Sequence, residues 1–545
     1  MKKTLSLLLA LALVLTSFVP TFAADSSKKE EQAIIKNVIM MIPDGMSFEA
    51  FTLARWFTPD WKFALDEILT GSVRTNNSDV PMADSAPAAT AMSTGYKSKA
   101  PYIGCYPQTF GMAGAKNYDP AKADMPIATV LEAAKYSGRS TGVVSTSRVN
   151  HATPAAFYSH HPNRSEYDTL IEQGVYQNLD VVLGAGTNYL TAEKRNDGED
   201  LISVLKDKGY TFITKRDELL NTKADKLWGL FAKKDLAYDL EADKTVEPSL
   251  EEMTKKAIEI LSKNENGFFL IVEGSEIDWA GHSNDPINMV GDILAYDKAV
   301  KAAIDFAKTN KDTVVISAAD HGTGGITMGN YHTSGTYTKN KLGYYTDLIK
   351  NAKGGALKAS SELNEDRTNI REVVKKYFGI TDLTDEEVKF IKEYDSAESG
   401  IGLMISERSG IGWTTHGHVG GDIGLYCYSS NPNVPALSGT IMNNEIGEYI
   451  ARVMNFDLDA LSEKLFVPAR PALEAKGAKI QWKNVSKDKE KKNHELIVTK
   501  GSNTYRFPVN KNIVYVNGQV KEFDGLTLFN EKAVFLPKAA IDLVK

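Results

Sequence analysis

The chain has 545 residues, a formal net charge of −7, 42% hydrophobic residues and only two cysteines. A chain of this length can bury a large core, and two cysteines are too few for a disulfide scaffold. The mildly acidic balance, without a concentrated basic stretch, argues against a nucleic-acid-binding surface. The sequence leaves open whether Cys105 and Cys427 pair.

Residues 1–23 have the pattern of a secretory signal peptide. Two lysines at the start precede an apolar run from Leu5 to Val14, and small residues follow at Ala23 and Ala24. The apolar run is too short to cross a membrane, and no second long apolar run follows it. We therefore expect cleavage after Ala23 and an exported protein without a transmembrane segment, secreted or associated with the cell envelope.

The first strand-like run of the mature chain, NVIMMIPDGM, ends in Asp44 and Gly45. Behind it, the stretch VPMADSAPAATAMSTG sets Ser85 among small residues. One interpretation is a helix cap formed by Asp84 or Ser85, with Pro87 in the first turn. The other is a nucleophile at a helix N-terminus, where free N–H groups and the helix dipole favour an anion. This stretch alone is compatible with both.

The segment STSRVNHATPAAFYSHHPNR supplies residues suited to an anionic substrate and a hard cation. Arg164 can bind two phosphate oxygens with its guanidinium fork, although an arginine taken alone is more often a surface residue. Thr153 offers a hydroxyl oxygen of the kind that magnesium accepts.

Two later strand-like runs end in acidic residues and histidines. GFFLIVEGSEIDWAGH contains Glu273, Asp278 and His282, and TVVISAADHG ends in Asp320 and His321. Four residues separate Asp278 from His282, so on a helix both lie on one face. In an open α/β sheet, the carboxyl ends of the strands meet at one edge, where ligands bind.

A pair of histidines, His416 and His418, precedes one further apolar run. Taken singly, each of these acidic residues and histidines has an ordinary explanation as a turn, a cap or a solvated side chain. Together, carboxylates and neutral imidazoles are the ligands that zinc takes in a site left open for substrate. Because the candidates exceed the needs of one ion, the sequence predicts a centre with several metals.

These motifs, in this order, resemble the alkaline phosphatase family from about residue 37 to 455. The resemblance rests on PDGM, ADSAPAATAMSTG, HATPA with Arg164, VEGSEIDWAGH, ADHG and TTHGHV. It implies an α/β fold with a large, mostly parallel sheet sandwiched by helices. It also implies hydrolysis of phosphate monoesters to an alcohol and inorganic phosphate through a phosphoserine intermediate, with two Zn²⁺ and one Mg²⁺.

Individual roles follow from the same resemblance. Ser85 corresponds to the nucleophile, and Arg164 to the group that binds phosphate. The implied ligands are Asp278, His282 and His418 for one zinc; Asp44, Asp320 and His321 for the second; and Asp44, Thr153 and Glu273 for magnesium.

Two positions depart from the best-known bacterial members, which carry Asp where this chain has His151 and Lys where it has Trp279. We expect His151 to open the third site to Zn²⁺ or Co²⁺ as well. We expect His151, Trp279 and His416 to lie next to the metal-binding residues, where they contact the ligands, without belonging to the main ligand sets.

The catalytic domain is predicted over residues 24–475. Within it, 331–412 is an insertion of the kind that covers the rim of the active site or meets the partner subunit of a homodimer. A charged linker is predicted over 476–487. The short strand-like runs of 488–545 resemble the N-terminal-like domain of copper amine oxidases, without implying copper, since His494 is their only histidine. A contact with the cell envelope and a plain structural cap remain open for this segment.

Three alternatives stand beside the phosphomonoesterase interpretation. A sulfatase of the same superfamily is disfavoured because no arginine follows Ser85 in SAPAA, and a phosphodiesterase because Arg164 is present. A non-catalytic envelope binding protein is disfavoured because such a module has no use for an activated serine.

Overall fold

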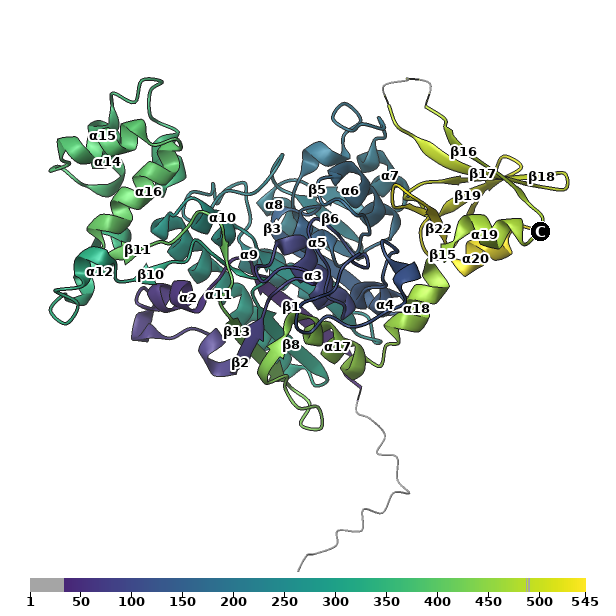
Figure 1. Ribbon diagram of the computed structural model, residues 1–545, viewed down its shortest axis with the longest axis horizontal. Helices are drawn as coiled ribbons and strands as arrows, with labels where there is room; N and C mark the ends of the chain where they lie inside the picture. Colours follow the sequence, from purple (N-terminus) through teal and green to yellow (C-terminus); the bar gives the residue numbers. More distant parts are fainter. Residues whose placement is uncertain (1–33, 487, 489–490) are drawn as a thin grey trace, which may run out of the picture. The chain divides into compact units, whose positions relative to one another are not determined.

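The fold is built on a ten-stranded sheet in the computed structural model, which describes residues 34–486, 488 and 491–545 (Figure 1). The predicted signal peptide lies outside the described residues. In sheet order the strands are β14 (Gly439–Met442), β2 (Leu69–Arg74), β13 (Ile423–Ser429), β8 (Thr313–Ala318), β1 (Asn37–Pro43), β7 (Phe268–Gly274), β3 (Ser140–Arg148), β4 (Val181–Ala185), β6 (Leu227–Leu230) and β5 (Thr211–Ile213). Pairing is parallel except at β13, which runs antiparallel to β2 and β8. The predicted large, mostly parallel sheet is confirmed.

The central strands are apolar along almost their whole length because both of their faces are covered by helices. Nearly every residue of β1, β7 and β8 is buried, as expected for parallel strands inside an α/β fold. The helices of the catalytic part are α2 (Phe48–Arg55), α3 (Ser85–Thr94), α4 (Val130–Tyr136), α5 (Ala152–Ala155), α6 (Tyr167–Tyr176), α7 (Leu201–Asp207), α8 (Arg216–Asn221), α9 (Leu250–Leu261), α10 (Glu276–His282), α11 (Pro286–Thr309) and α17 (Asn443–Met454). Short 3₁₀ turns are η1 (Pro59–Trp61), η2 (Leu65–Ile68), η3 (Pro120–Lys122) and η4 (Thr187–Leu190). One group of mutually packed helices contains α3, α4, α5 and α17, and another contains α2, α9, α10 and α11.

The order of the three central strands brings their carboxyl ends together. β1 lies between β8 and β7 and is parallel to both, with Pro43 opposite Gly274 and Met41 opposite Ser317. The residues that follow these strands therefore emerge at the same edge of the sheet. Close to this edge, a short ladder pairs β9 (Gly322–Thr323) with β12 (His418–Val419).

The predicted insertion, 331–412, is helical (green in Figure 1). Its elements are η5 (Tyr331–Thr333), α12 (Leu342–Lys350), α13 (Ala356–Ser360), α14 (Ile370–Phe378), α15 (Asp385–Glu393) and α16 (Ala397–Arg408). The chain enters and leaves it through an antiparallel pair, β10 (Thr327–Met328) and β11 (Ile411–Gly412), so its two ends lie side by side.

The C-terminal part forms a small β-rich domain, as expected from its short strand-like runs. A five-stranded antiparallel sheet contains β16 (Lys479–Asn484), β17 (His494–Lys500), β18 (Asn503–Pro508), β19 (Ile513–Val516) and β20 (Gln519–Glu522). A three-stranded sheet contains β15 (Val467–Pro468), β22 (Val534–Leu536) and β21 (Leu528–Phe529). The helices are α18 (Leu458–Leu465), α19 (Ala469–Glu474) and α20 (Lys538–Asp542).

The small domain begins earlier than the predicted boundary at 488. Strand β16 lies inside the predicted linker, 476–487, and its whole length pairs with β17. Ala469 and Leu473, upstream of that stretch, belong to the core of the small domain. In β16, the half-buried Ile480 and Trp482 alternate with exposed polar residues, among them Lys479 and Lys483. These lysines give the strand the composition of a charged connector, so its apolar alternation was not recognised in the sequence.

Two further points concern the cysteines, whose pairing the sequence left open, and the membrane-spanning segment that it did not predict. Cys105 and Cys427 are both buried and unpaired in the described part of the chain, which settles the question left open by the sequence. None of the helices among the described residues combines the length and the apolar character needed to span a bilayer.

Candidate active site

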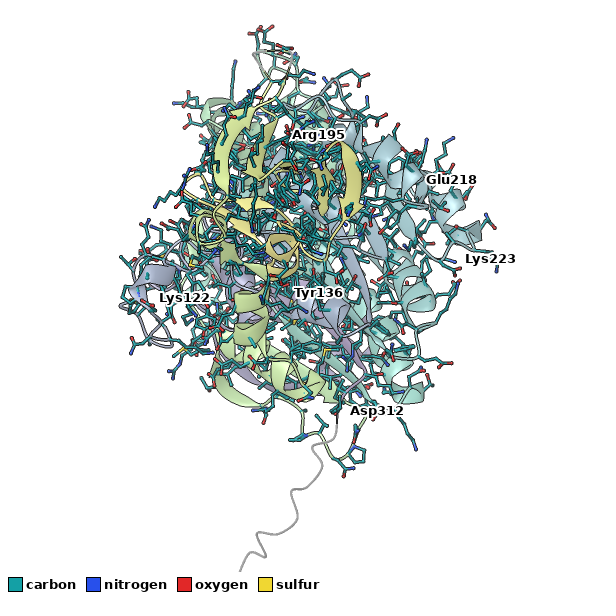
Figure 2. The ribbon with its side chains drawn as sticks, turned by 90° about the vertical axis from the view of Figure 1, so that its right-hand side faces the viewer. Lys122, Tyr136, Arg195, Glu218, Lys223 and Asp312 are labelled. Carbon is teal, nitrogen blue, oxygen red and sulfur yellow. The ribbon has the colours of Figure 1, made fainter. Side chains whose placement is uncertain are left out.

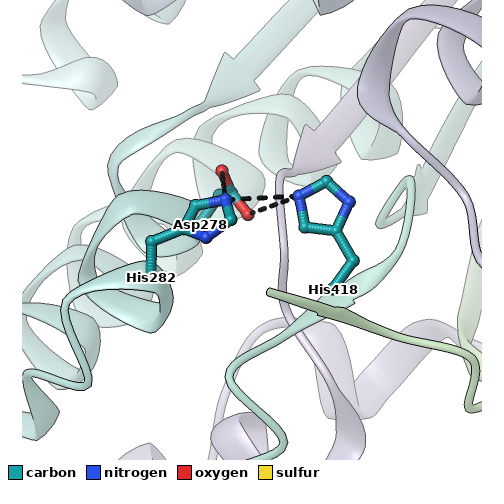
Figure 3. A group of neighbouring side chains, drawn as sticks. All are labelled: Asp278, His282 and His418. Carbon is teal, nitrogen blue, oxygen red and sulfur yellow. Dashed lines mark hydrogen bonds and ion pairs between the residues drawn. The ribbon is translucent and has the colours of Figure 1, made fainter. Parts of the chain in front are cut away.

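Asp278, His282 and His418 form a first group of metal-ligand side chains (Figure 3). Asp278 and His282 lie one turn apart on α10, with Oδ2 of Asp278 3.3 Å from Nε2 of His282. His418, on β12, brings its Nε2 to 3.2 Å from that of His282 and 3.7 Å from Oδ1 of Asp278. One carboxylate and two imidazoles that converge in this way could hold a metal ion and leave a fourth position for substrate.

Hydrogen bonds on the outer sides of these residues fix how they face one another. Nδ1 of His282 contacts the backbone oxygen of His416 at 2.5 Å, and Nδ1 of His418 contacts that of Ala83 at 2.8 Å. When both rings are neutral, each Nδ1 therefore carries the proton and each Nε2 is left to offer its lone pair to a cation. The Thr323 hydroxyl donates to Oδ1 of Asp278.

Asp44, Asp320 and His321 form a second group at the ends of β1 and β8. All three side chains are fully buried, with Nε2 of His321 3.0 Å from Oδ2 of Asp320 and 3.8 Å from Oδ1 of Asp44. The ring of His321 stacks on that of His418, with centroids 3.6 Å apart, so the two groups adjoin. These are the two ligand sets implied by the resemblance, and the fold brings each of them together.

Glycine is required at position 45, between these groups. Gly45 has a φ of +76°, and a Cβ there would lie 2.7 Å from Cα of Asp278. Its backbone N–H donates to Oδ1 of Asp320. The turn after β1 therefore needs both the left-handed conformation and the absence of a side chain.

The third predicted group is less tightly assembled. The Thr153 hydroxyl, on α5, donates to Oδ2 of Asp44 at 3.2 Å. Glu273, at the end of β7, accepts from the Ser145 hydroxyl at 2.6 Å. Asp44, a member of the second group, thus also contacts Thr153, one of the residues predicted for magnesium.

The donors of this centre fit divalent cations. Oδ1 of Asp44 and Oε1 of Glu273 are buried and make no hydrogen bond to any described residue. Burial raises the pKa of the Asp44 carboxyl well above its usual range, and the charges of Asp320 and Asp278 raise it further. Burial likewise raises the pKa of Glu273 to about 7. Crowded, desolvated carboxylates of this kind are costly unless a cation compensates them.

These pKa shifts predict how metal removal acts on stability. Glu273 has a pKa of about 7 in the fold against 4.5 for the free group, and that of His282 is raised from 6.5 to about 9. Both groups hold a proton more tightly when folded. Their contribution to stability is therefore complete below the unfolded values and is lost as the pH rises through 7 and then 9.

We expect metal-free protein to lose stability between pH 6.5 and 9, relative to protein loaded with zinc and magnesium. Differential scanning fluorimetry of both forms across this range measures the loss of stability. Titratable groups elsewhere in the chain contribute equally to both forms, so the difference between the two Tm values reports the metal centre. The gap between the two Tm values should widen by about 3 °C or more as the pH rises. A gap that stays constant, or narrows, would contradict the assignment of these buried groups to a cation centre.

Ser85 lies where the two ligand groups meet. It is the first residue of α3, and its Oγ is 3.3 Å from Nε2 of His321. The helix-cap interpretation is wrong for Asp84, which precedes α3 but makes no side-chain cap hydrogen bond. Its carboxylate instead accepts from Nη1 of Arg164 at 2.6 Å.

Arg164, His151 and Trp279 line the same region. Nη2 of Arg164 lies 3.3 Å from Nε2 of His151, and the His151 ring meets the Trp279 indole edge-on at 5.8 Å. The Arg164 side chain is 20% exposed, so its guanidinium can reach a ligand from solvent. Burial alone would lower the pKa of Arg164, but the Asp84 carboxylate raises it, so the guanidinium stays charged.

His416 does not join the first ligand group. Its Nδ1 contacts the backbone oxygen of His282 at 2.9 Å, and its Nε2 lies 2.8 Å from the hydroxyl of Tyr394. Sequence reasoning missed Tyr394, which comes from the insertion, and Thr323, which stands two residues after His321. Thr323 had a signal, its place in the ADHGT motif, whereas nothing near Tyr394 in the sequence marks it.

Comparisons with known proteins identify the family of this chain. A family model described as alkaline phosphatase matches residues 35–456, and one described as copper amine oxidase N-terminal domain matches residues 451–542. Alkaline phosphatase 3 of Bacillus subtilis is 35% identical over 463 residues, which cover 81% of this chain and 93% of that protein. The repressible alkaline phosphatase of Saccharomyces cerevisiae is 32% identical over 519 residues, which cover 84% and 87%.

Solved structures give the same result. The cold-active alkaline phosphatase of Shewanella sp. superposes with a TM-score of 0.65 at 29% identity, covering 77% of this chain and 99% of that one. The Thermus thermophilus alkaline phosphatase has a TM-score of 0.69 at 23% identity, covering 81% and 96%, and supports the fold. Since the family model spans the sheet and both ligand groups, this chain belongs to the alkaline phosphatase family and is a phosphomonoester hydrolase.

Proposed function

We propose that this chain hydrolyses phosphate monoesters through a phosphoserine intermediate on Ser85, at a centre of two Zn²⁺ and one Mg²⁺. The observation that carries the proposal is the position of the Ser85 hydroxyl. It opens helix α3 at the junction of two converging ligand groups, 3.3 Å from Nε2 of His321. Asp84, the residue before it, holds the guanidinium of Arg164.

The residues that would hold each ion follow from the three groups. Asp278, His282 and His418 would bind one zinc, and Asp44, Asp320 and His321 the other. Asp44, Thr153 and Glu273 would bind magnesium. When bound, the two zinc ions supply Lewis-acid stabilisation of the attacking and leaving oxygens of an in-line displacement.

The chain's own residues bind and orient the phosphoryl group. The guanidinium of Arg164 is suited to donate to two of its oxygens, and the carboxylate of Asp84, the residue before Ser85, accepts from its Nη1 and so holds it in place. The small side chains of Ala86, Ala88 and Ala89 leave room beside the hydroxyl. The N-terminus of α3 adds backbone N–H groups and a favourable dipole for the negative charge.

The reaction then proceeds in two displacements. Oγ of Ser85 releases its proton to solvent and forms a bond to phosphorus, while the bond from phosphorus to the substrate's alcohol oxygen breaks and that oxygen takes up a proton from water. A water molecule next attacks the phosphoserine and gives up a proton, the Ser85–phosphorus bond breaks, Oγ of Ser85 takes up a proton, and inorganic phosphate leaves. Throughout, Arg164 holds the non-bridging oxygens, whose charge redistributes in each transition state.

The third site is proposed to take Mg²⁺, with Zn²⁺ or Co²⁺ as competitors. Nδ1 of His151 is buried and has no hydrogen-bond partner among the described residues, whereas Nε2 lies 3.3 Å from Nη2 of Arg164, which can only donate. To bind a cation near Thr153 through Nδ1, the ring would carry its proton on Nε2 and give up this contact with Arg164. Burial lowers the pKa of His151 well below its usual value, and Arg164 adds to the shift, so the imidazole is neutral. A neutral imidazole suits zinc and cobalt better than magnesium.

Arg164→Ala is expected to weaken the binding of substrate and product more than it slows turnover. A paired guanidinium–phosphate contact contributes about 1.5–3 kcal/mol, so KM and the inhibition constant of inorganic phosphate should rise by about 10- to 100-fold. Steady-state kinetics with added phosphate measures both constants. Arg216→Ala, which removes a surface arginine paired with Glu252, is the matched control and should leave both unchanged. Unaltered phosphate inhibition in Arg164→Ala would exclude its role.

The reaction class is tested by comparing three chromogenic substrates: a phosphate monoester, a phosphate diester and a sulfate ester. We expect the monoester to be preferred across neutral to alkaline pH, with activity lost after chelator treatment. Re-addition of zinc together with magnesium or with cobalt should restore activity. Whether magnesium or cobalt restores more activity shows which metal the third site prefers beside His151. Preferred turnover of the diester or of the sulfate ester would place the enzyme among the phosphodiesterases or sulfatases of the superfamily.

Export and assembly complete the proposal. We propose that the leader 1–23 directs secretion and is removed after Ala23, which N-terminal sequencing of the exported protein checks. A homodimer formed through the 331–412 insertion and an envelope contact through residues 488–545 stay predictions. Gel filtration with light scattering and fractionation of the producing cells test them.

A further inference from the structure

The small C-terminal domain is joined to the catalytic part by a buried, fully paired amide. Asn510, in the loop after β18, is 6% exposed and has a φ of +65°. Its amide N–H donates to Oε2 of Glu172 at 2.9 Å, and its amide oxygen accepts from Gln173 at 3.2 Å. Both partners lie on α6. A buried polar group with specific partners on each atom sets one docking geometry, because any other arrangement leaves buried groups unpaired.

Charged residues surround this contact. Lys511 pairs with Glu199 at 2.6 Å and with Glu172 at 3.5 Å, and Arg195 lies 3.7 Å from Glu172. Arg195 is labelled in Figure 2, where the molecule is seen from the side of the C-terminal domain. Glu172, Glu199 and Asp197 are close enough to hold a cation, but Lys511 and Arg195 already balance them. This group therefore belongs to the domain contact.

A second polar contact lies at Asp124, on another part of the catalytic domain. Asn530 donates to its backbone oxygen at 2.8 Å, and Lys532 forms an ion pair with its carboxylate. The other carboxylate oxygen of Asp124 accepts from the hydroxyl of Tyr102. The small domain thus contacts the catalytic part at two separate places, at α6 and at Asp124.

From α6, the contact leads to the segment that carries Arg164. The Gln173 side chain accepts from the backbone N–H of His160 at 2.8 Å and donates to its backbone oxygen at 3.1 Å. The His160 ring also packs edge-on against Phe466, immediately before β15, with centroids 4.7 Å apart. His160, four residues before Arg164, is therefore held from two sides by C-terminal residues, directly and through Gln173.

From Asp124, the contact leads to the helix that carries Ser85. Tyr102, which donates to Asp124, accepts through its backbone oxygen from the hydroxyl of Thr90, on α3. That hydroxyl in turn accepts from the backbone N–H of Gly104 at 3.0 Å. The strip around Tyr102 is thus bonded both to the small domain and to α3.

The two strips are bonded to each other. Ile103 and His161 form a two-hydrogen-bond bridge, at 2.8 and 2.9 Å, and the backbone N–H of Arg164 donates to the oxygen of Pro101 at 2.9 Å. The backbone of Arg164 is thereby fixed against the strip that contacts α3. Weakening the contact of the C-terminal domain with α6, or its contact with Asp124, should therefore increase the motion of the Arg164 guanidinium relative to Ser85.

We propose that the C-terminal domain acts as an intramolecular brace, which holds the paired strips 101–104 and 160–164 and so positions Arg164 opposite Ser85. Asn510 and Lys532 are its positioning residues. The effect on phosphate binding rests on the role proposed above for Arg164, whereas the bracing itself does not.

Asn510→Gly tests the brace without straining the backbone, because glycine accepts a positive φ. Asn517→Gly is the matched control: it lies at a φ of +51° in the β19–β20 turn of the same domain, where its side chain contacts Thr504 and Asn503. In Asn510→Gly we expect amide hydrogen exchange to quicken in residues 158–173. We also expect KM and the inhibition constant of phosphate to rise by about threefold to tenfold with kcat changed less than twofold.

The second variant is Lys532→Met, with Lys521→Met on the exposed strand β20 as its control. It should quicken exchange around Tyr102 and raise the same two constants, and it supplies the test if Asn510→Gly does not fold. Exchange and phosphate inhibition that match those of the controls would overturn the brace. If the wild-type protein itself fails to bind phosphate, the proposed function falls, and the exchange data alone decide for or against the brace.

Discussion

Ser85→Ala is expected to lower kcat/KM for a phosphate monoester by about 10⁴-fold or more while the bound metals are retained. The hydroxyl is the only group of the first turn of α3 that can form a covalent bond to phosphorus, and α3 itself does not depend on it. Loss of a nucleophile removes the whole two-step route and leaves only the contribution of binding and charge stabilisation. Steady-state kinetics with metal analysis of the same sample measures both expectations.

The matched control for this substitution is Ser93→Ala in the same helix. Ser93 is fully buried, and its hydroxyl donates to the backbone oxygen of Ala156 at 2.7 Å, so it serves packing alone. Its removal should lower Tm slightly and change kcat less than threefold. A Ser85→Ala protein with more than about 1% of the wild-type activity would show that another group attacks phosphorus.

Asp278→Asn is expected to remove one metal equivalent and to lower kcat/KM by about 10³-fold. Asp278 contacts both histidines of its group and accepts from Thr323, so its charge organises the whole set. Replacing the carboxylate by an amide keeps the shape but takes away the negative charge that the cation needs. Metal content after dialysis, measured by inductively coupled plasma mass spectrometry, reports the loss independently of activity.

Asp292→Asn is the control for burial and shape. Asp292 is a buried aspartate on α11 and accepts from the backbone of Asp239. Burial raises its pKa well above the usual value, so its substitution by the neutral amide changes little. Full metal content and activity should persist. An Asp278→Asn protein that keeps both zinc ions would refute the ligand assignment.

The sheet and the ligand groups are predictable from the sequence because parallel strands carry their functional residues at one end. Three apolar runs, each followed by acidic residues, must bring these residues to one edge once the runs pair as neighbours. Asp44, Glu273 and Asp320 satisfy this rule. The i, i+4 spacing of Asp278 and His282 likewise predicts that both lie on one face of a helix, as they do on α10.

Features that depend on packing between distant segments could not be predicted. The carboxylate of Asp84 stands at a position where it could cap helix α3, but it accepts instead from Arg164, eighty residues later in the chain. Tyr394 reaches His416 only because the insertion brings the end of α15 beside the segment before β12. Strand β16 was not recognised because of its lysines. The hydrogen bonds of Asn510 with Glu172 and Gln173 join residues more than three hundred positions apart, which no local pattern indicates.

The covalent intermediate gives the most direct test of the central claim, that Ser85 attacks phosphorus. Wild-type and Ser85→Ala proteins, loaded with zinc and magnesium, are mixed with a phosphate monoester, quenched rapidly in acid and digested for peptide mass spectrometry. We expect one phosphoryl group on the wild-type peptide that contains Ser85, and none on the variant. Turnover that proceeds without that adduct at any quench time, or a phosphoryl group found on another residue, would contradict the mechanism.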